Sequence, residues 1–230
     1  ILYEHEGKDL LLRGGVAIPQ SQLITKAAAK IKLNLPLFIK AQVLSGKRAV
    51  AGGIVEVTAE AKILPILRKM FGHKINGEAV EKILVEEAIS TEQSWYVSLS
   101  YDTTVRRPVI SWSNAGGTDI ETREVETRTL DPLSPVVPED LPLPSELIQK
   151  LINLFFKQDC LLLEINPLVY GSNVARERGW YTLDAKVKLD DNATGRHPEW
   201  SYEPRSVAGR IPTEREIAAK QIDQKDYRGT

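Results

Sequence analysis

A strand–turn–strand pattern between residues 95 and 112 limits the folds open to this chain more than any other feature. An Asp-Thr-Thr turn at 102–104 separates two β-rich runs, and the second run covers 108–112. In the first run, apolar and aromatic residues recur at every second position, the period of a β-strand with two different faces; they are Trp95, Val97, Leu99 and Tyr101. Two such runs joined by a short turn predict an antiparallel hairpin.

Helix-like and strand-like segments are mixed along the rest of the chain. A proline-rich stretch, 131–144, is expected to be an extended connector, with Ser145 capping the helix that follows. Further strands are expected at 37–43, 52–58, 83–86, 160–167 and 180–187, and helices at 4–15, 26–31, 63–71, 145–155 and from 213 onward. Mixed helices and hairpin-linked strands predict an α+β fold.

The charge balance and the cysteine content argue against several classes of protein. The 230 residues carry 30 Lys and Arg against 31 Asp and Glu, so a basic surface built for nucleic acid is not expected. No apolar run approaches the roughly 20 residues that a membrane helix needs, so no membrane partner is expected. A lone cysteine, Cys160, cannot form an internal disulfide. We therefore expect a reducing compartment, the cytoplasm or, in a eukaryote, the mitochondrial matrix.

Lys40 and the loop after it form the first candidate site. Lys40 lies among apolar residues of an expected strand, where a buried ammonium group is costly unless an anion meets it. The loop at 45–53 combines small residues with the two cations Lys47 and Arg48, which suits a phosphate chain. The alternative is a basic hairpin tip beside a solvated lysine. Residue types alone slightly favour this alternative, because the loop matches neither common phosphate-loop pattern.

Three oxygen-bearing side chains form the second candidate site. Glu164 and Asn166 are two apart on an expected strand, so their side chains should share one face, and Asp184 lies on the probable neighbouring strand. Such oxygens are the ligands that Mg²⁺ prefers. The alternative is a turn at Asn166-Pro167 with Asp184 on the surface. We favour the site because polar residues close the very apolar run 160–163.

Six short motifs give the chain a resemblance to a known family. In chain order they are Lys40-Ala41-Gln42-Val43, Ala51-Gly52-Gly53, Leu84-Val85-Glu86-Glu87-Ala88, Ala115-Gly116-Gly117, Glu164-Ile165-Asn166-Pro167-Leu168 and Leu183-Asp184-Ala185-Lys186. Their order and spacing resemble the ATP-grasp region of the succinyl-CoA synthetase β subunit, other ADP-forming acyl-CoA synthetases and ATP-citrate lyase. The resemblance runs from the N-terminus to about residue 192.

The resemblance implies an ATP-grasp fold of two lobes with mixed or antiparallel sheets. The ATP-grasp-like domain would cover 1–200, with a smaller lobe at about 18–88. Residues 201–230 would form a connector and a helix leading to a C-terminal domain of the CoA-ligase type. The chain would then be one part of a longer protein and inactive alone.

The resemblance also implies roles for individual residues around Mg²⁺ and ATP or ADP, with GTP left open as the nucleotide. Lys40, Lys47, Arg48 and Ala49 would hold the phosphates, Glu86 and the backbone near Ile89 would lie at the adenine or ribose, and Ser94 stands where the family has a ribose-binding glutamate. Asn166 and Asp184 would bind Mg²⁺. Glu164 would steer phosphoryl transfer to a histidine.

In this family the histidine lies on an α-type subunit or domain that also binds CoA and the carboxylic acid. The resemblance also implies a reaction of the tricarboxylic acid cycle. The chain departs from the family at Lys47, Ala49, Val50 and Ser94, which keeps a second hypothesis open: a non-catalytic ATP-grasp module for assembly or nucleotide sensing. A third hypothesis is an ATP-grasp carboxylate–amine ligase, which would need no acceptor histidine.

Overall fold

The structure is a computed structural model that describes residues 1–117, 123–202 and 213–225. Within these residues the helices are α1 (Glu4–Arg13), α2 (Ile63–Phe71), α3 (Ser145–Lys157) and α4 (Glu214–Lys225), with short 3₁₀ turns at η1 (Glu60–Lys62) and η3 (Asp191–Arg196). The strands are β1 (Ser21–Ile24), β2 (Leu37–Ala41), β3 (Ile54–Val57), β4 (Lys74–Ile75), β5 (Glu78–Ala79), β6 (Ile83–Glu87), β7 (Ser90–Asp102), β8 (Arg107–Ser113), β9 (Glu126–Thr129), β10 (Cys160–Ser172), β11 (Arg178–Thr182) and β12 (Ala185–Leu189).

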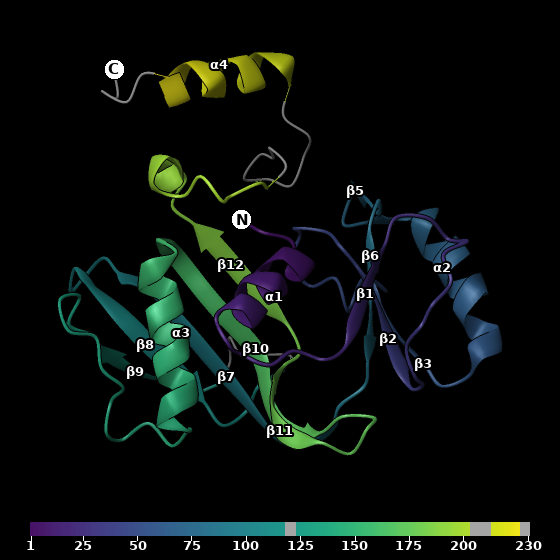
Figure 1. The fold of residues 1–230 in the computed structure, drawn as a ribbon, viewed down its shortest axis with the longest axis horizontal. Coiled ribbons are helices and arrows are strands. Elements are labelled where there is room, and N and C mark those ends of the chain that lie inside the picture. The colour runs from purple at the N-terminus through teal and green to yellow at the C-terminus, as the bar shows by residue number, and fades with distance from the viewer. Residues whose placement is uncertain (118–122, 203–212, 226–230) are drawn as a thin grey trace.

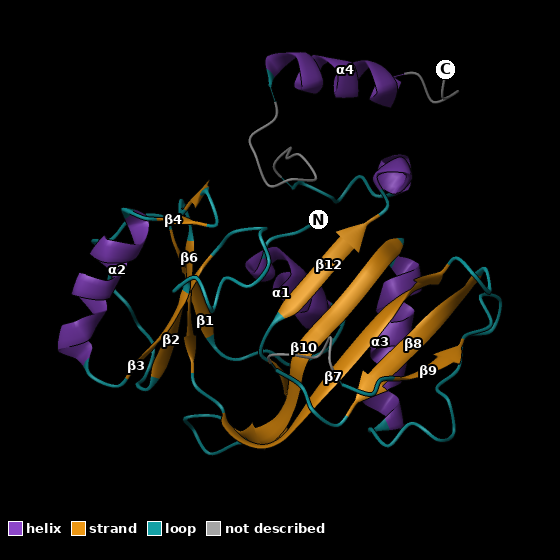
Figure 2. Ribbon diagram, turned by 180° about the vertical axis from the view of Figure 1, so that it is seen from behind, coloured by secondary structure: helices purple, strands orange, loops and turns teal. Residues whose placement is uncertain are grey.

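Two separate antiparallel sheets organise the molecule (Figure 1). The smaller sheet has the order β1-β6-β2-β3, and helix α2 lies against it. The larger sheet has the order β11-β10-β7-β8-β9, with β12 also paired to β10. Helix α1 lies between the two sheets, as Figure 2 shows from behind. The fold is therefore α+β, as expected.

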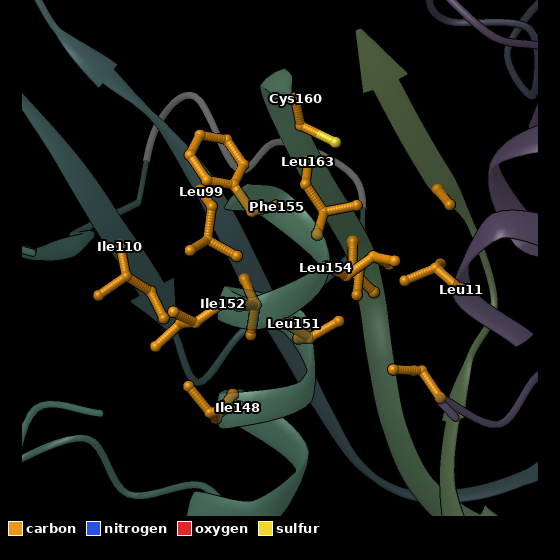
Figure 3. Packing of buried hydrophobic residues seen from close by; sticks show 14 of the residues in the cluster. Leu11, Leu99, Ile110, Ile148, Leu151, Ile152, Leu154, Phe155, Cys160 and Leu163 are labelled. Carbon is orange, nitrogen blue, oxygen red and sulfur yellow. The ribbon is translucent and has the colours of Figure 1, made fainter. Parts of the chain in front are cut away.

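Each sheet has its own hydrophobic core. Helix α3 buries an apolar face on the larger sheet, where Leu151 and Phe155 meet Leu99 and Leu163 (Figure 3). In the smaller sheet, Leu67 and Met70 of α2 belong to a second cluster with β2 and β6. Burying a large apolar side chain stabilises a fold by about 1.5–3 kcal/mol. Each core therefore holds its own sheet together.

Several expected elements are present. Strands β7 and β8 form the hairpin, pairing from Tyr96 with Ser113 to Asp102 with Arg107. The stretch 131–144 has neither helix nor strand. The last helix begins with a capping box, in which Thr213 and Glu216 exchange hydrogen bonds. Ser145 was expected to be a cap but is the first residue of α3, after Pro144.

One expected helix was wrong and one expected strand is divided. Residues 26–31 form turns and extended chain, although Lys and Ala favour a helix. There the amide of Gln22 holds the backbone of Lys30 and Lys32, and Ala27 packs on the smaller core. Tertiary contacts therefore override helix propensity. The strand expected at 180–187 is split into β11 and β12, and Leu183 and Asp184 form the gap between them.

None of the helices in the described part of the chain has the length and apolar character needed to cross a membrane.

Candidate functional site

A cluster of buried charges lies where α1, the smaller sheet and the gap between β11 and β12 meet. Three acidic and three basic side chains form this ionic cluster: Glu4, Lys8, Lys40, Arg48, Glu86 and Asp184. Helix α1 supplies Glu4 and Lys8, which are one helical turn apart. The cluster has equal numbers of acidic and basic groups, so each buried charge can be paired with an opposite one, which offsets the cost of removing it from water.

Lys40 has a complete set of partners. Its Nζ donates to Glu4 Oε1 at 2.9 Å and to the carbonyl oxygen of Leu183 at 2.6 Å, and it also forms an ion pair with Glu86. Only 8% of its side chain is exposed. From residue types alone, a solvated lysine beside a basic hairpin tip was slightly favoured. That alternative was wrong, because Lys40 is buried and meets anions. In this structure the anions beside Lys40 are the carboxylates of Glu4 and Glu86.

Lys8 contacts the same three groups from the other side. Its Nζ lies 2.8 Å from Glu4 Oε1 and 2.7 Å from the carbonyl oxygen of Leu183, and it donates to Glu86 Oε1. The side chain is 1% exposed. Leu183 lies in the break between β11 and β12, outside the pairing of either strand with β10. Its carbonyl oxygen can therefore accept from both ammonium groups.

Arg48 links the loop after β2 to both carboxylates at the edge of the cluster. Its Nη2 pairs with Glu4 and lies 3.1 Å from Asp184 Oδ1, while Nη1 donates to the carbonyl of Ala41 at 3.0 Å. Asp184 keeps 41% of its side-chain surface exposed. The guanidinium therefore points inward from the loop, and the Asp184 carboxylate remains open to solvent on one side.

The shifts in pKa follow from burial and from these ion pairs. Burial alone would raise the pKa of Glu4, but Lys40, Lys8 and Arg48 outweigh it and hold that pKa well below its usual range. Burial alone would lower the pKa of Lys40, but Glu4, Glu86 and Asp184 raise it. For Asp184, loss of surrounding water and the charge of Glu4 raise the pKa against the effect of Arg48. Glu4 and Lys40 are thus held in their charged forms.

The rest of the loop after β2 is exposed around Arg48. Lys47 and Ala49 are exposed, and Lys47 has the left-handed backbone φ of 57°. The Oγ of Ser45 is buried and has no hydrogen-bond partner within the described part of the chain. A buried hydroxyl without a partner is costly.

Glu164 lies on β10, opposite Ser98 of β7 and Lys186 of β12. Burial raises its pKa, Lys186 opposes this, and the charge of Asp184 raises the pKa further. Glu164 is therefore a partly buried carboxylate with Lys186 as its register partner on β12.

Asn166 follows on the same strand and is a backbone neighbour of Asp184. Its N–H donates to the carbonyl oxygen of Asp184 at 3.2 Å. Its side-chain amide pairs with the backbone of Gly117, accepting from the N–H at 2.6 Å and donating to the carbonyl at 3.0 Å. Asn166 is thus hydrogen-bonded both to the glycine turn at 116–117 and to the segment between β11 and β12.

The remaining expected binding residues are spread over β6 and β7. Glu86 is 1% exposed and uses its carboxylate on Lys8 and Lys40. Ile89 is half-buried between β6 and β7. The Oγ of Ser94 donates to the carbonyl of Gly116 at 3.1 Å, and Glu92 forms an ion pair with Arg178. Of this group, Glu86 joins the ionic cluster.

Sequence reasoning missed Glu4 and Lys8 as members of the site. A signal for them exists in the opening helix. Glu4, Lys8 and Leu11 follow the spacing of one helical face, and Leu11 is fully buried. Two opposite charges on a face that buries leucine indicate a buried ion pair.

The residues present fit a magnesium ion with few protein ligands. Among the described residues, no group of three or more His, Cys, Asp or Glu side chains is arranged to hold a metal. Mg²⁺ usually takes only one or two protein oxygens and keeps several waters or phosphate oxygens. The half-open carboxylate of Asp184 and the amide oxygen of Asn166, two residues joined by a backbone hydrogen bond, are oxygens of that kind. Both already accept hydrogen bonds, Asp184 Oδ1 from Arg48 and from the N–H of Ala185, and Asn166 Oδ1 from the N–H of Gly117.

Comparison with known proteins identifies the family. The family model of the ATP-grasp domain matches residues 1–132. The chain is 32% identical over 235 residues to the succinate–CoA ligase [ADP-forming] β subunit of Methanocaldococcus jannaschii, covering 92% of this chain and 63% of that protein. It is 35% identical over 224 residues to the corresponding subunit of Rubrobacter xylanophilus, covering 86% and 57%. The chain thus spans about three-fifths of the length of these relatives.

Solved structures share the fold of this chain. ATP citrate lyase from Methanothrix soehngenii superimposes with a TM-score of 0.74 at 22% identity, covering 97% of this chain and 60% of the other. A dinucleotide-forming acetyl-coenzyme A synthetase from Ca. Korarchaeum cryptofilum superimposes with a TM-score of 0.62 at 17% identity, covering 82% and 93%. At these identities the likeness shows the fold, which is the ATP-grasp fold. The chain belongs to the ATP-grasp domain family.

Proposed function

We propose that this chain is the nucleotide-binding part of an ADP-forming acyl-CoA synthetase. The observation that carries the proposal is the junction of the two sheets, where Lys40, Arg48 and Asp184 meet. Relatives named as ADP-forming succinate–CoA ligase β subunits match most of the chain, which supports this class of activity. We also propose a domain at 1–200 with a smaller lobe at about 18–88, followed by a connector and helix at 201–230 that lead to a further domain.

The nucleotide is proposed to lie between the two sheets, with its phosphates on the loop after β2. Lys40 and Arg48 lie at this junction, paired with Glu4, Glu86 and Asp184. Exposed Lys47 and Ala49 offer side-chain charge and backbone N–H groups on the loop itself. The buried Ser45 hydroxyl has no hydrogen-bond partner among the described residues and is proposed to donate to a phosphate oxygen. Glu86, Ile89 and Ser94 are proposed to lie toward the adenine and ribose, with ATP and GTP both open.

Asn166 and Asp184 are proposed to hold Mg²⁺, which when bound neutralises charge on the phosphate oxygens. Glu164 is proposed to accept a hydrogen bond from the imidazole N–H of an incoming histidine. This hydrogen bond orients the other ring nitrogen toward the terminal phosphate. The histidine, CoA and the carboxylic acid are assigned to an α-type subunit or domain. Phosphoryl transfer needs positioning and charge neutralisation most, which these side chains supply.

A reducing compartment is part of the proposal, the cytoplasm or the mitochondrial matrix. The single cysteine, Cys160, is buried and unpaired, which suits such a compartment.

Calorimetry of the 230-residue chain with ATP and ADP, with and without Mg²⁺, tests nucleotide binding. We expect Mg²⁺-dependent heat in the wild type and a loss of affinity in Lys40→Met. Lys69→Met, which changes an exposed lysine of α2, is the matched control and should bind like the wild type. No heat with either nucleotide up to millimolar concentration would refute the proposal.

Labelling of a reconstituted partner subunit separates the remaining hypotheses. Glu164→Gln should lose phosphate transfer to the partner histidine, whereas Glu126→Gln, on exposed β9 of the same sheet, should retain it. Equal background labelling in wild type and Glu164→Gln, with nucleotide binding intact, would favour the non-catalytic module. Transfer of phosphate to a carboxylate without any phosphohistidine would favour a carboxylate–amine ligase.

A further inference from the structure

Lys8 and Lys40 duplicate each other in the ionic cluster. Both ammonium groups contact Glu4, Glu86 and the carbonyl oxygen of Leu183. One comes from helix α1 and the other from β2 of the smaller sheet. One lysine would already give each of these acceptors a cationic partner. The presence of a second lysine on the same three acceptors therefore requires an explanation.

Neither ammonium group has a proton to spare. An ammonium group has three N–H donors, and each of these two lysines already has three acceptors. Lys40 can therefore contact a phosphate oxygen only by releasing Glu4, Glu86 or Leu183. Releasing a carboxylate would leave a buried negative charge short of a counterion, which is strongly unfavourable.

We infer that Lys8 is a positioning residue that remains as the counterion of Glu4 and Glu86 when Lys40 turns toward a polyphosphate. Lys8 is the deeper of the two, with 1% of its side chain exposed against 8% for Lys40. Lys40 also lies on the strand that leads into the 45–53 loop, whereas Lys8 lies on a helix behind it. This inference rests on the proposed function, because it assumes that a polyphosphate binds beside Lys40.

The arrangement makes polyphosphate affinity depend on the charge balance of the cluster. With Lys8 present, Glu4 and Glu86 keep a cation when Lys40 leaves them. Without Lys8, Lys40 is the only ammonium group that Glu4 and Glu86 share, and its release is opposed. Removing Glu4 together with Lys8 restores equal numbers of acidic and basic groups. The affinity lost by removing Lys8 should therefore return when Glu4 is neutralised as well.

Calorimetry with Mg-ATP on folded protein tests this dependence in four chains. We expect Lys8→Met to bind about tenfold more weakly than the wild type or worse, and Lys8→Met/Glu4→Gln to recover most of that loss. Lys150→Met is the matched control, because Lys150 also pairs with a glutamate one turn away but at an exposed site. It should bind like the wild type.

The outcomes separate the inference from the proposed function. No binding by the wild type would refute the proposed function, and the inference would fall with it. Binding by Lys8→Met equal to the wild type would overturn the inference alone, as would a double variant that is as weak as Lys8→Met. If Lys8→Met does not fold, a folded double variant with wild-type affinity supports the inference and a folded double variant with weak affinity overturns it.

NMR of the ammonium groups gives a readout that needs no variant to fold. Adding Mg-ATP to the wild type should shift the Lys40 ammonium signal and leave that of Lys8 protected from exchange with water. Both signals shifting together, or neither shifting under saturating ATP, would contradict separate roles for the two lysines.

Discussion

Gly116 lies where the backbone of the glycine turn approaches β7. A Cβ at this position would lie 2.4 Å from the carbonyl oxygen of Trp95 and 2.9 Å from the Cβ of Pro167. Gly116→Ala must therefore displace backbone, and we expect it to lower the free energy of unfolding by about 1–3 kcal/mol. Urea unfolding measures this. Gly195→Ala is the control, since a Cβ there meets nothing within 4 Å, and equal stability of both variants would contradict the close approach.

Cys160 is expected to be chemically inert in the folded chain. The residue is 1% exposed, and burial, with a smaller effect of Asp159, raises the pKa of its thiol to about 12. The thiolate is the reactive species, so at pH 8 almost none is present. A thiol reagent such as DTNB should label the cysteine at the rate of global unfolding. Rapid labelling of native protein would show that the start of β10 opens locally.

The sequence allowed some single residues to be placed and not others. For Lys40 the sequence showed that burial in an apolar strand would need an anion beside it, but residue types alone slightly favoured a solvated lysine. The structure buries Lys40, so that alternative was wrong. That its partners come from residues 4 and 86 was not predictable, since nothing local links those positions. The roles given to Lys47, Ala49, Asn166 and Glu164 stay predictions, and the labelling experiment above tests that of Glu164.

Helix α3 shows why some elements are readable from sequence. Its apolar residues repeat with helical spacing, and those residues form the buried face, including Ile148, Leu151 and Phe155. The segment 26–31 has good helix formers but no comparable face, and contacts made by Gln22 hold it extended. Periodic burial therefore predicted an element correctly where propensity alone did not.

The face that α3 buries should control the stability of the larger sheet. Leu151 is completely buried between the helix and the sheet (Figure 3). Leu151→Ala should lower the free energy of unfolding by about 2–5 kcal/mol, because it removes apolar contacts and leaves a cavity. Lys157→Ala changes an exposed residue of the same helix and serves as the control in chemical denaturation. A loss below 1 kcal/mol in Leu151→Ala would contradict the packing.

At the scale of the whole molecule, the ionic cluster makes the free energy of unfolding depend on pH in the acid range. The pKa of Glu4 is held well below its usual range in the folded chain. Its contribution is therefore complete above the unfolded pKa of about 4.3 and is lost as the pH falls through the lower folded value. Thermal unfolding of the wild type should show a melting temperature that drops steeply below about pH 4.

Glu4→Gln separates this effect from general acid unfolding. At pH 7 the variant should lose about 3–5 kcal/mol of stability, because buried cations are left without their shared carboxylate. Its melting temperature should also depend less on pH below 4. Asp9→Asn, in an exposed ion pair of the same helix, should behave like the wild type. An unchanged acid profile in Glu4→Gln would show that other carboxylates govern the transition.

The sequence by itself determined the elements with a regular pattern of burial: the hairpin of β7 and β8, helix α3, and the α+β class. Its motifs also indicated the family, which the comparisons show. The tertiary structure alone decided how Glu4, Lys8, Lys40 and Leu183 meet, because residues so distant along the chain are brought together only by two sheets docking around α1. Local periodicity reports which face of an element is buried, whereas the partner of a buried charge depends on the whole fold.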